Sequence, residues 1–437
     1  MTQKKAFPII SPNAAGIDIS SKEHFVAVNP DLSEPVKAFG AFTEDLETLV
    51  AWLKECKVDT VAMEATGIYW VSLFLMIQEA GIDVLLVTAK HVKNVKGKKT
   101  DISDAEWIRQ LHSCGLLSSG FQPDGFTRKL RTYVRHRKNL IEMSATHVRM
   151  MQKAFEQMNV KLQHVIADIT GKSGREIIES ILKGERDVEK LTALCDNRIR
   201  REKKESIKKS LNGIWKEEHL FELEQSYNMY KTYSTSIRDC DKKIEEHLKT
   251  LVNEKELEEK KQNGKRNKND INLGNTNLVK TITSVDLTEI FGITDSNAIG
   301  IISEIGLDMS KWPTVKHFTS WLNLAPNNKI SGGKILSSKI PKKKNRAGQV
   351  FKLAAYSIQR SNNWLSHFYK KIKSKKGTPK AIVATARKIA VIFYKMLKDK
   401  VKFEPMRNEI YEKQFKEKQI NRLNKQAKTL GLQLVRV

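Results

Sequence analysis

The sequence predicts an α/β fold with one mixed β-sheet at its N-terminal end. A mainly α-helical region that contains a coiled coil follows, and then a small α-rich C-terminal domain. Three patterns predict this order: apolar runs alternate with amphipathic segments near the N-terminus, residues 175–270 are charged with sparse apolar positions, and residues 309–398 contain no acid. The expected segments are 1–125 for the α/β domain, 126–277 for the long helices with a flexible linker at their end, 278–405 for the C-terminal domain and 406–437 for a charged tail.

The first segment should contain five strands and three helices in the order β-β-β-α-β-α-β-α. Three antiparallel strands followed by alternating helices and strands give one mixed sheet with helices on both faces. Ligand sites on such sheets gather at strand ends. The expected elements are a hairpin over 14–29, a strand over 35–42, a helix from 43, a strand over 58–63, a helix over 68–80, a strand over 82–88 and a helix over 101–114.

The rest of the chain should be mainly helical. Residues from 126 onward and the charged region 175–270 favour long helices, with a coiled-coil hairpin as one arrangement. The polar tract 254–277 is typical of a flexible linker. The remaining expected elements are two helices around a glycine turn at 291–295, a polar loop over 327–347, helices over 349–359 and 379–398, and a helical tail after 408.

The net charge points to a polyanionic partner. Lys and Arg number 77 against 50 Asp and Glu, which gives a formal charge of +27 and a pI of about 9.7. Nucleic acid is the leading partner and an anionic membrane surface the competitor. No apolar run approaches the length of a membrane span, and the first residues make a poor signal peptide. Four dispersed cysteines fit reduced thiols, so we expect a cytoplasmic protein without membrane partners.

The positive charge is concentrated in two regions. Residues 309–398 hold 21 Lys and Arg and no acid, and a second acid-free run of cations begins at Arg128. Either run is a solvated face or a nucleic-acid backbone surface, and the missing acids favour the latter. The glycine turn at 291–295 is either a plain helix turn or a phosphate-binding turn. The candidate nucleic-acid-binding residues are Lys98, Lys99, Arg128, Arg131, Arg135, Lys334, Lys342, Lys343, Lys344 and Arg346.

Two carboxylates, Asp101 and Asp104, open the helix expected over 101–114. Their i, i+3 spacing places them on one helix face, where like charges destabilise a helix slightly. A divalent cation would reverse that effect, because Mg²⁺ prefers hard oxygen ligands. The alternative is an N-capping role for Thr100 or Asp101 with a solvated Asp104.

Asp18 and Glu64 fall at the ends of the first and fourth expected strands. If these strands are neighbours, both carboxylates meet the Asp101–Asp104 pair at one sheet edge. Clustered carboxylates repel one another unless they are protonated or bind metal. Two Mg²⁺ ions would neutralise them and clamp a phosphodiester. Taken singly, Asp18 fits a turn, and Glu64 fits a helix cap together with Thr66.

Three short blocks resemble the DEDD transposases of bacterial insertion sequences. They are Gly-Ile-Asp-Ile-Ser at 16–20, Met-Glu-Ala-Thr-Gly at 63–67 and Lys-Thr-Asp-Ile-Ser-Asp-Ala at 99–105. Trp-Leu-Asn-Leu-Ala-Pro at 321–326 and Lys-Ile-Ser-Gly-Gly-Lys at 329–334 resemble the second domain of that family. The resemblance covers about 12–165 and 278–400. The segment 166–277 is longer than the family pattern, and the turn at 291–295 lacks its usual double glycine.

The resemblance implies a RuvC-like N-terminal domain of the ribonuclease H fold and a recombinase activity. In that family a structured non-coding bridge RNA pairs with donor and target DNA, and the active sites of a homo-oligomer, a dimer or tetramer, are shared between subunits. Carried over by residue, Asp18, Glu64, Asp101 and Asp104 bind Mg²⁺ or Mn²⁺. Ser331 becomes the nucleophile that forms a phosphoserine bond with DNA, and Ser337 and Ser338 are second choices.

Two other functions remain open on the sequence. A RuvC-like nuclease would use water as the nucleophile and its C-terminal domain only for binding. A non-catalytic nucleic-acid scaffold would need neither the carboxylates nor the serine. Replacement of Ser331 distinguishes the first alternative from the recombinase, and replacement of Asp104 distinguishes the second.

Overall fold

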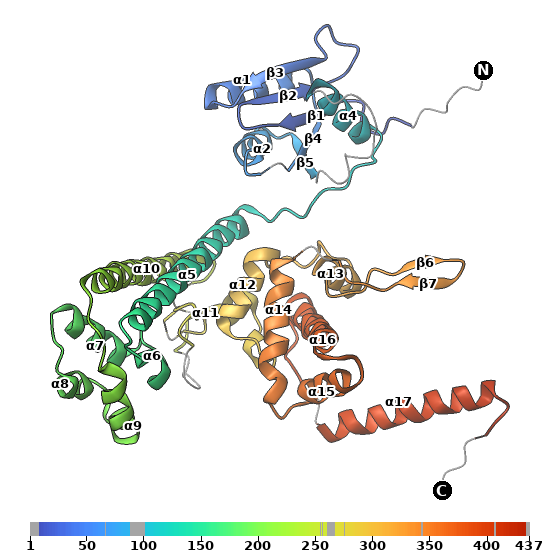
Figure 1. Cartoon of the computed structure of the whole chain (residues 1–437). Helices are drawn as coiled ribbons and strands as arrows, with labels where there is room; N and C mark the ends of the chain where they lie inside the picture. The colour runs from blue at the N-terminus through green and yellow to red at the C-terminus, as the bar shows by residue number, and fades with distance from the viewer. Residues whose placement is uncertain are drawn as a thin grey trace. The chain divides into compact units, whose positions relative to one another are not determined.

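The computed structural model describes residues 8–65, 67–87, 101–253, 255, 257–259, 267–274, 276–341, 344–405 and 408–433 (Figure 1). Within these ranges, the side chains of Asp101 and of several residues in the last helix are not described. The chain forms two compact units, Met1–Gln122 and Pro123–Val437. In the described part, no helix has the length and apolar character needed to cross a membrane.

The first unit contains the mixed sheet that the sequence predicts. The strands lie in the order β3-β2-β1-β4-β5. The pairs β1–β2 and β2–β3 are antiparallel, and β1–β4 and β4–β5 are parallel. Its elements are β1 (Ala14–Ile19), β2 (Glu23–Ala27), β3 (Val36–Gly40), α1 (Thr43–Glu55), β4 (Thr60–Glu64), α2 (Trp70–Glu79), β5 (Asp83–Val87) and α4 (Asp101–Ser113).

Helices cover both faces of this sheet. On one face, Ile17 of β1 and Met63 of β4 join a buried cluster with Leu49 of α1 and Phe74 of α2. On the other face, Ala62 of β4 and Val87 of β5 pack against Ile108 of α4. Alternate residues of one strand therefore face different helices, as the two-residue period of a strand requires.

The second unit begins with two 33-residue helices, α5 (Gly125–Gln157) and α10 (Glu217–Lys249), which pack side by side (Figure 1). A buried cluster that includes Phe155 and Tyr227 joins them to the shorter helices between them. These are α6 (Leu162–Val165), α7 (Lys172–Leu182), α8 (Val188–Ala193) and α9 (Asn197–Leu211). We expected a coiled-coil hairpin within residues 175–270. The long helix of that region, α10, instead packs against α5, which precedes the region in the sequence. A heptad coiled coil stays a prediction.

The remaining described elements of the second unit are helices of 3 to 22 residues and one hairpin. Phe318, Phe351 and Phe393 form the centre of their apolar core, with their rings in edge or tilted contacts. The elements are α11 (Leu278–Thr283), η2 (Leu287–Glu289), α12 (Asp295–Ile305), α13 (Val315–Trp321), β6 (Lys329–Ser331), β7 (Lys334–Ser337), α14 (Arg346–Ser357), η3 (Ile358–Arg360), α15 (Trp364–Lys376), α16 (Thr378–Asp399) and α17 (Asn408–Thr429).

The end of the expected flexible linker is packed in place. Ile271 and Leu273 are buried, at 8% and 5% exposure. The Arg137 guanidinium donates hydrogen bonds to the carbonyls of Asn269 and Asp270, each at 3.0 Å. The prediction of a free linker is therefore wrong for residues 267–274, because two apolar side chains and a buried arginine hold them. Residues 260–266 lie outside the described residues.

Candidate active site

Asp18 and Glu64 are brought side by side by the parallel pairing of β1 and β4. Ile17 of β1 lies opposite Met63 of β4, so the next residues, Asp18 and Glu64, are neighbours across the two strands. Because Ile17 and Met63 face α1 and α2, alternation turns Asp18 and Glu64 toward the face that α4 covers. Both side chains are half-buried.

Helix α4 runs antiparallel to β1, in backbone contact with Gly16. A Cβ atom on Gly16 would lie 2.2 Å from the Arg109 nitrogen and 2.4 Å from the Ala105 carbonyl oxygen. At the other end of α4, His112 Nε2 lies 2.9 Å from Thr60 Oγ1 at the start of β4. The last turn of α4 therefore lies at the beginning of β4, and its first turn lies toward the ends of β1 and β4.

This orientation places the first turn of α4, which holds Asp104, toward the edge of the sheet where Asp18 and Glu64 lie. Asp104 is half-buried and precedes the fully buried Ala105, whose carbonyl oxygen lies against Gly16 of β1. Among the side chains that the structure describes, no three His, Cys, Asp or Glu residues form a ready metal cluster. The side chain of Asp101 is outside that set. Half-buried carboxylates that share one edge are the hard oxygen donors that Mg²⁺ and Mn²⁺ prefer, so the residues fit such an ion.

The structural alternatives for two of these carboxylates do not match the elements. Helix α2 begins at Trp70 with Tyr69 in the N-cap position, so Glu64 lies five residues too early to cap it. Asp18 is inside β1 and pairs with Phe25 of β2, so it is not a turn residue. Thr66, the expected partner of Glu64 in capping, lies outside the described residues, as do Lys98 and Lys99.

Ser331 lies at the tip of an exposed two-stranded hairpin. It pairs with Lys334 across a turn formed by Gly332 and Gly333, whose φ angles are 54° and 76°. Two central residues with positive φ make the tight hairpin turn that favours glycine. Apart from each glycine's neighbours in the chain, no atom of the described residues lies within 4 Å of a Cβ built on it, so the tip is open to an approaching backbone. The sequence predicted a loop here, and glycine spacing was the signal for the turn.

The other serines differ in their surroundings. Ser337 is half-buried at the end of β7, and its hydroxyl accepts a 3.4 Å hydrogen bond from the Lys339 amide. Ser338 is exposed beyond the strand. Neither is next to the glycine turn, so the hairpin distinguishes Ser331 from both second choices.

Two of the predicted nucleic-acid-binding arginines bind inside the protein. Arg131 donates to the Ser303 and Glu304 carbonyls at 3.1 and 2.7 Å, and Arg135 makes two bonds to the Glu304 carboxylate at 2.8 and 2.7 Å. Burial lowers the pKa of Arg131 to about 10, against the raising effect of Glu304. Sequence reasoning missed Glu304 because it lies 169 residues from Arg135.

The other predicted cations lie on three different elements of the second unit. Arg128 lies in the first turn of α5, Lys334 is the first residue of β7, and the exposed Lys344 and Arg346 lie at the start of α14. Lys342 and Lys343 lie outside the described residues. The structure thus brings Arg346 toward the arginines of α5, since it acts on the charge of Arg131, and leaves Lys334 on the hairpin.

The glycine turn at 291–295 packs against helix α14. A Cβ on Gly292 would lie 2.6 Å from the Ala354 carbonyl oxygen, and its φ is 86°. Asn297 donates a 3.1 Å hydrogen bond to the Gly292 carbonyl. Close helix packing therefore explains this glycine without a phosphate.

Two transposase family models match the chain in the order that the resemblance predicted. Residues 15–160 match a DEDD transposase family of the IS110 type, which covers the sheet, α4 and α5. Residues 286–370 match the transposase IS116/IS110/IS902 family, which covers the serine hairpin and α14. The chain matches no curated protein. Because the two models together cover more than half of the chain and include both parts of the candidate site, the chain belongs to the IS110-type family of insertion-sequence transposases and is a DNA recombinase.

Proposed function

We propose that this transposase cuts and rejoins DNA through a phosphoserine intermediate, with Ser331 as the nucleophile. Asp18, Glu64, Asp101 and Asp104 would bind Mg²⁺ or Mn²⁺. The observation that carries the proposal is the orientation of α4, whose first turn lies toward the ends of β1 and β4 where Asp18 and Glu64 lie. A bound divalent ion supplies positive charge beside the reacting phosphate.

In the serine reaction, each phosphate ester bond that breaks is replaced by another phosphate ester bond, so the ends can be rejoined. The Ser331 hydroxyl gives up its proton as Oγ attacks phosphorus, and the new O–P bond forms as one sugar–phosphate ester bond breaks. The leaving sugar oxygen takes up a proton and becomes a hydroxyl. Attack by another sugar hydroxyl on the phosphoserine reverses these steps and joins a new pair of ends. The open glycine turn supports this role, because a nucleophile must approach a DNA backbone closely.

The partners proposed for this reaction are donor DNA, target DNA and a structured non-coding guide RNA. The net charge of +27 supports polyanion binding. Because the carboxylates lie in Met1–Gln122 and Ser331 in Pro123–Val437, the reaction requires both kinds of unit to meet on one phosphate. That meeting can occur within a chain or between chains of a homo-oligomer, and it would take place at the nucleoid.

Trapping of the covalent intermediate tests this proposal. Purified protein is incubated with Mg²⁺, guide RNA and labelled element-end DNA, then denatured, and the protein–DNA adduct is measured by gel mobility and mass spectrometry. We expect an adduct on Ser331 that Ser331→Ala abolishes and that the neighbouring control Ser338→Ala retains. Cleavage by Ser331→Ala without any adduct would overturn the phosphoserine step and support water as the nucleophile.

A further inference from the structure

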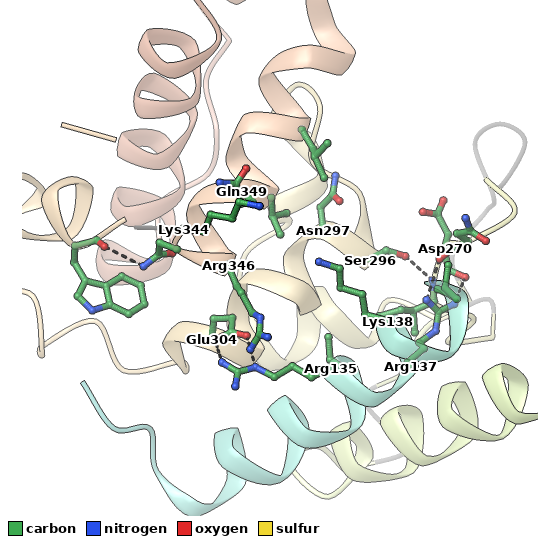
Figure 2. Close-up of a pocket in the computed structure, with 18 residues that line it drawn as sticks. Arg135, Arg137, Lys138, Asp270, Ser296, Asn297, Glu304, Lys344, Arg346 and Gln349 are labelled. Carbon is green, nitrogen blue, oxygen red and sulfur yellow. Dashed lines mark hydrogen bonds and ion pairs between the residues drawn. The ribbon is translucent and has the colours of Figure 1, made fainter. Parts of the chain in front are cut away.

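An open groove of about 750 Å³ lies in the second unit, and none of the candidate active-site residues lines it. Its walls come from α5, from residues 269–271, from both ends of α12, from Trp321 at the end of α13, and from residues 344–353 at and before α14. Figure 2 shows Lys138 reaching from α5 toward Ser296 and Asn297, while Arg346 lies beside Glu304 and Arg135. Five segments that are separate in the sequence thus line one surface.

The groove carries more positive charge than its own carboxylates neutralise. Five cationic side chains and two carboxylates, Glu304 and Asp270, line it. Arg135 pairs with Glu304, Arg137 pairs with Asp241 outside the lining, and the Asp270 carboxylate accepts hydrogen bonds from Asn267. The remaining three are Lys138, Lys344 and Arg346, all exposed. Lys138 has only a solvent-exposed contact of 4.0 Å with Glu142, which is worth little. Among the described residues, Lys344 and Arg346 have no ion-pair partner.

The fold holds like charges together at one end of the groove. Arg128 and Arg135 of α5 and Arg346 of α14 all disfavour the charge on Arg131, and Glu304 is the carboxylate that opposes them. Clustered cations repel one another, and an anion placed among them removes that repulsion. Arginine forks are also the side chains best matched to phosphate oxygens.

Neutral hydrogen-bonding groups line the rest of the groove. The Ser296 hydroxyl accepts a 2.6 Å bond from the Ile271 amide, which leaves its own O–H able to donate outward. Gln349 in the first turn of α14 adds an amide, and the N-terminal ends of α12 and α14 both border the space. Cations, hydroxyls, amides and helix N-termini are the groups that contact nucleic-acid backbones.

We propose that this groove binds the sugar–phosphate backbone of a nucleic-acid strand, with Lys138, Lys344 and Arg346 as its phosphate contacts. The groove is open and its free cations are exposed, which suits a continuous strand better than an enclosed small anion. This inference rests on the proposed function to the extent that the protein acts on nucleic acid, and it adds a binding surface separate from the reacting residues. Glu304 then serves to hold Arg135 and Arg131 in place between α5 and α12.

A pair of matched double variants tests the groove. Lys138→Gln with Arg346→Gln removes one lysine and one arginine from it. The control, Arg201→Gln with Lys204→Gln, removes the same charges from exposed positions on α9 that do not line it. Binding of fluorescent single-stranded RNA, single-stranded DNA and duplex DNA to the full chain is measured by anisotropy at several salt concentrations, after circular dichroism confirms that each variant is folded.

We expect the groove variant to lose about tenfold or more in affinity for at least one of the three probes. Its plot of log affinity against log salt should be shallower by about 1.4 for a single strand or about 1.8 for a duplex, because each lost phosphate contact is worth roughly 0.7 or 0.9. The probe that loses affinity identifies RNA or DNA as the occupant. The control variant should stay close to wild type.

Two results would overturn the groove and are distinguishable from failure of the proposed function. If the groove variant keeps the wild-type affinity, or if the control variant loses as much affinity, the protein binds nucleic acid but this groove does not. Wild-type protein without salt-dependent binding to any probe would remove the groove and nucleic-acid action together. The trapping of an adduct on Ser331 tests the recombinase reaction separately from these two binding results.

Discussion

Glu64 and Asp18 face the same helix because each follows an apolar residue that faces the opposite side of the sheet. We expect Glu64→Gln to lower the DNA cleavage rate at least about 100-fold, since a lost metal ligand removes several kcal/mol of charge stabilisation. The control is Asp83→Asn, an exposed carboxylate that opens β5. Cleavage is followed on labelled element-end DNA with Mg²⁺ and after chelation. An unchanged rate in Glu64→Gln would remove this residue from the metal site.

The buried pair of Arg137 and Asp241 fastens α5 to α10. Both side chains are under 10% exposed, with Arg137 Nε at 2.5 Å from Asp241 Oδ1. We expect Asp241→Ala to lower the free energy of unfolding by about 3–5 kcal/mol, because it leaves a buried guanidinium without its counter-ion. Asp239→Ala, which removes an exposed carboxylate 3.9 Å from Lys242, should change it by less than about 0.5 kcal/mol. Urea titrations of both variants measure the difference, and equal effects would contradict this account.

Single residues differed in how far their roles could be predicted from the sequence. Asp18 and Glu64 could be placed because strand alternation and strand ends are local patterns. The contacts of Arg131 and Arg135 could not, since their partner Glu304 is on α12 and only tertiary packing reveals it. A run of cations without nearby acids therefore indicated that the region carries excess positive charge. It did not indicate which of these cations are bound to other parts of the protein.

At the scale of elements, Gly16 determines how closely α4 approaches β1. A methyl group at this position would lie 2.2 Å from a backbone nitrogen of α4, so the helix must move. We expect Gly16→Ala to lower the free energy of unfolding by about 1–3 kcal/mol. We also expect it to lower the DNA cleavage rate, because Asp104 moves with α4. Gly120→Ala is the control, since its Cβ would meet only the Leu86 carbonyl at 3.5 Å. Retained cleavage in a folded Gly16→Ala protein would contradict the role given to α4.

The first unit was predictable element by element, while the second was not. Each strand and helix of the sheet has a short, clear periodicity, and glycine or charged turns mark the ends. The pairing of α5 with α10 depends on apolar faces nearly a hundred residues apart, which no local pattern connects. The linker over 254–277 looked flexible because it is polar, yet Arg137 binds its carbonyls at 269 and 270.

At the scale of the molecule, the two units separate the two kinds of proposed chemistry. Carboxylates belong to the first unit, and the serine hairpin and basic groove belong to the second. The sequence indicated this division through charge, because the acid-free region 309–398 lies entirely in the second unit. Charge composition predicts a partner class, and only the packed structure shows which cations line one surface.

The first unit should lose stability in mild acid. His24 and His112 are buried at 2% and 8% exposure, and burial lowers the pKa of both imidazoles. The pKa of His112 is lowered although this residue lies in the last turn of α4, where the helix dipole favours positive charge. Their neutral forms stabilise the fold fully above pH 6.5, and this contribution is lost as the pH falls through the lowered folded pKa.

We therefore expect the unfolding free energy of the first unit to fall with acidification below pH 6.5, by up to about 1.4 kcal/mol per pH unit for each histidine. His112→Gln keeps a hydrogen-bonding group beside Thr60 and should remove about half of this dependence. Urea titrations between pH 5 and 8, read by a hydrogen-exchange pulse at fixed pH on peptides of β1 and β4, measure it. Stability that stays level or rises toward pH 5 would show that the fold does not hold these imidazoles neutral, and would contradict this account.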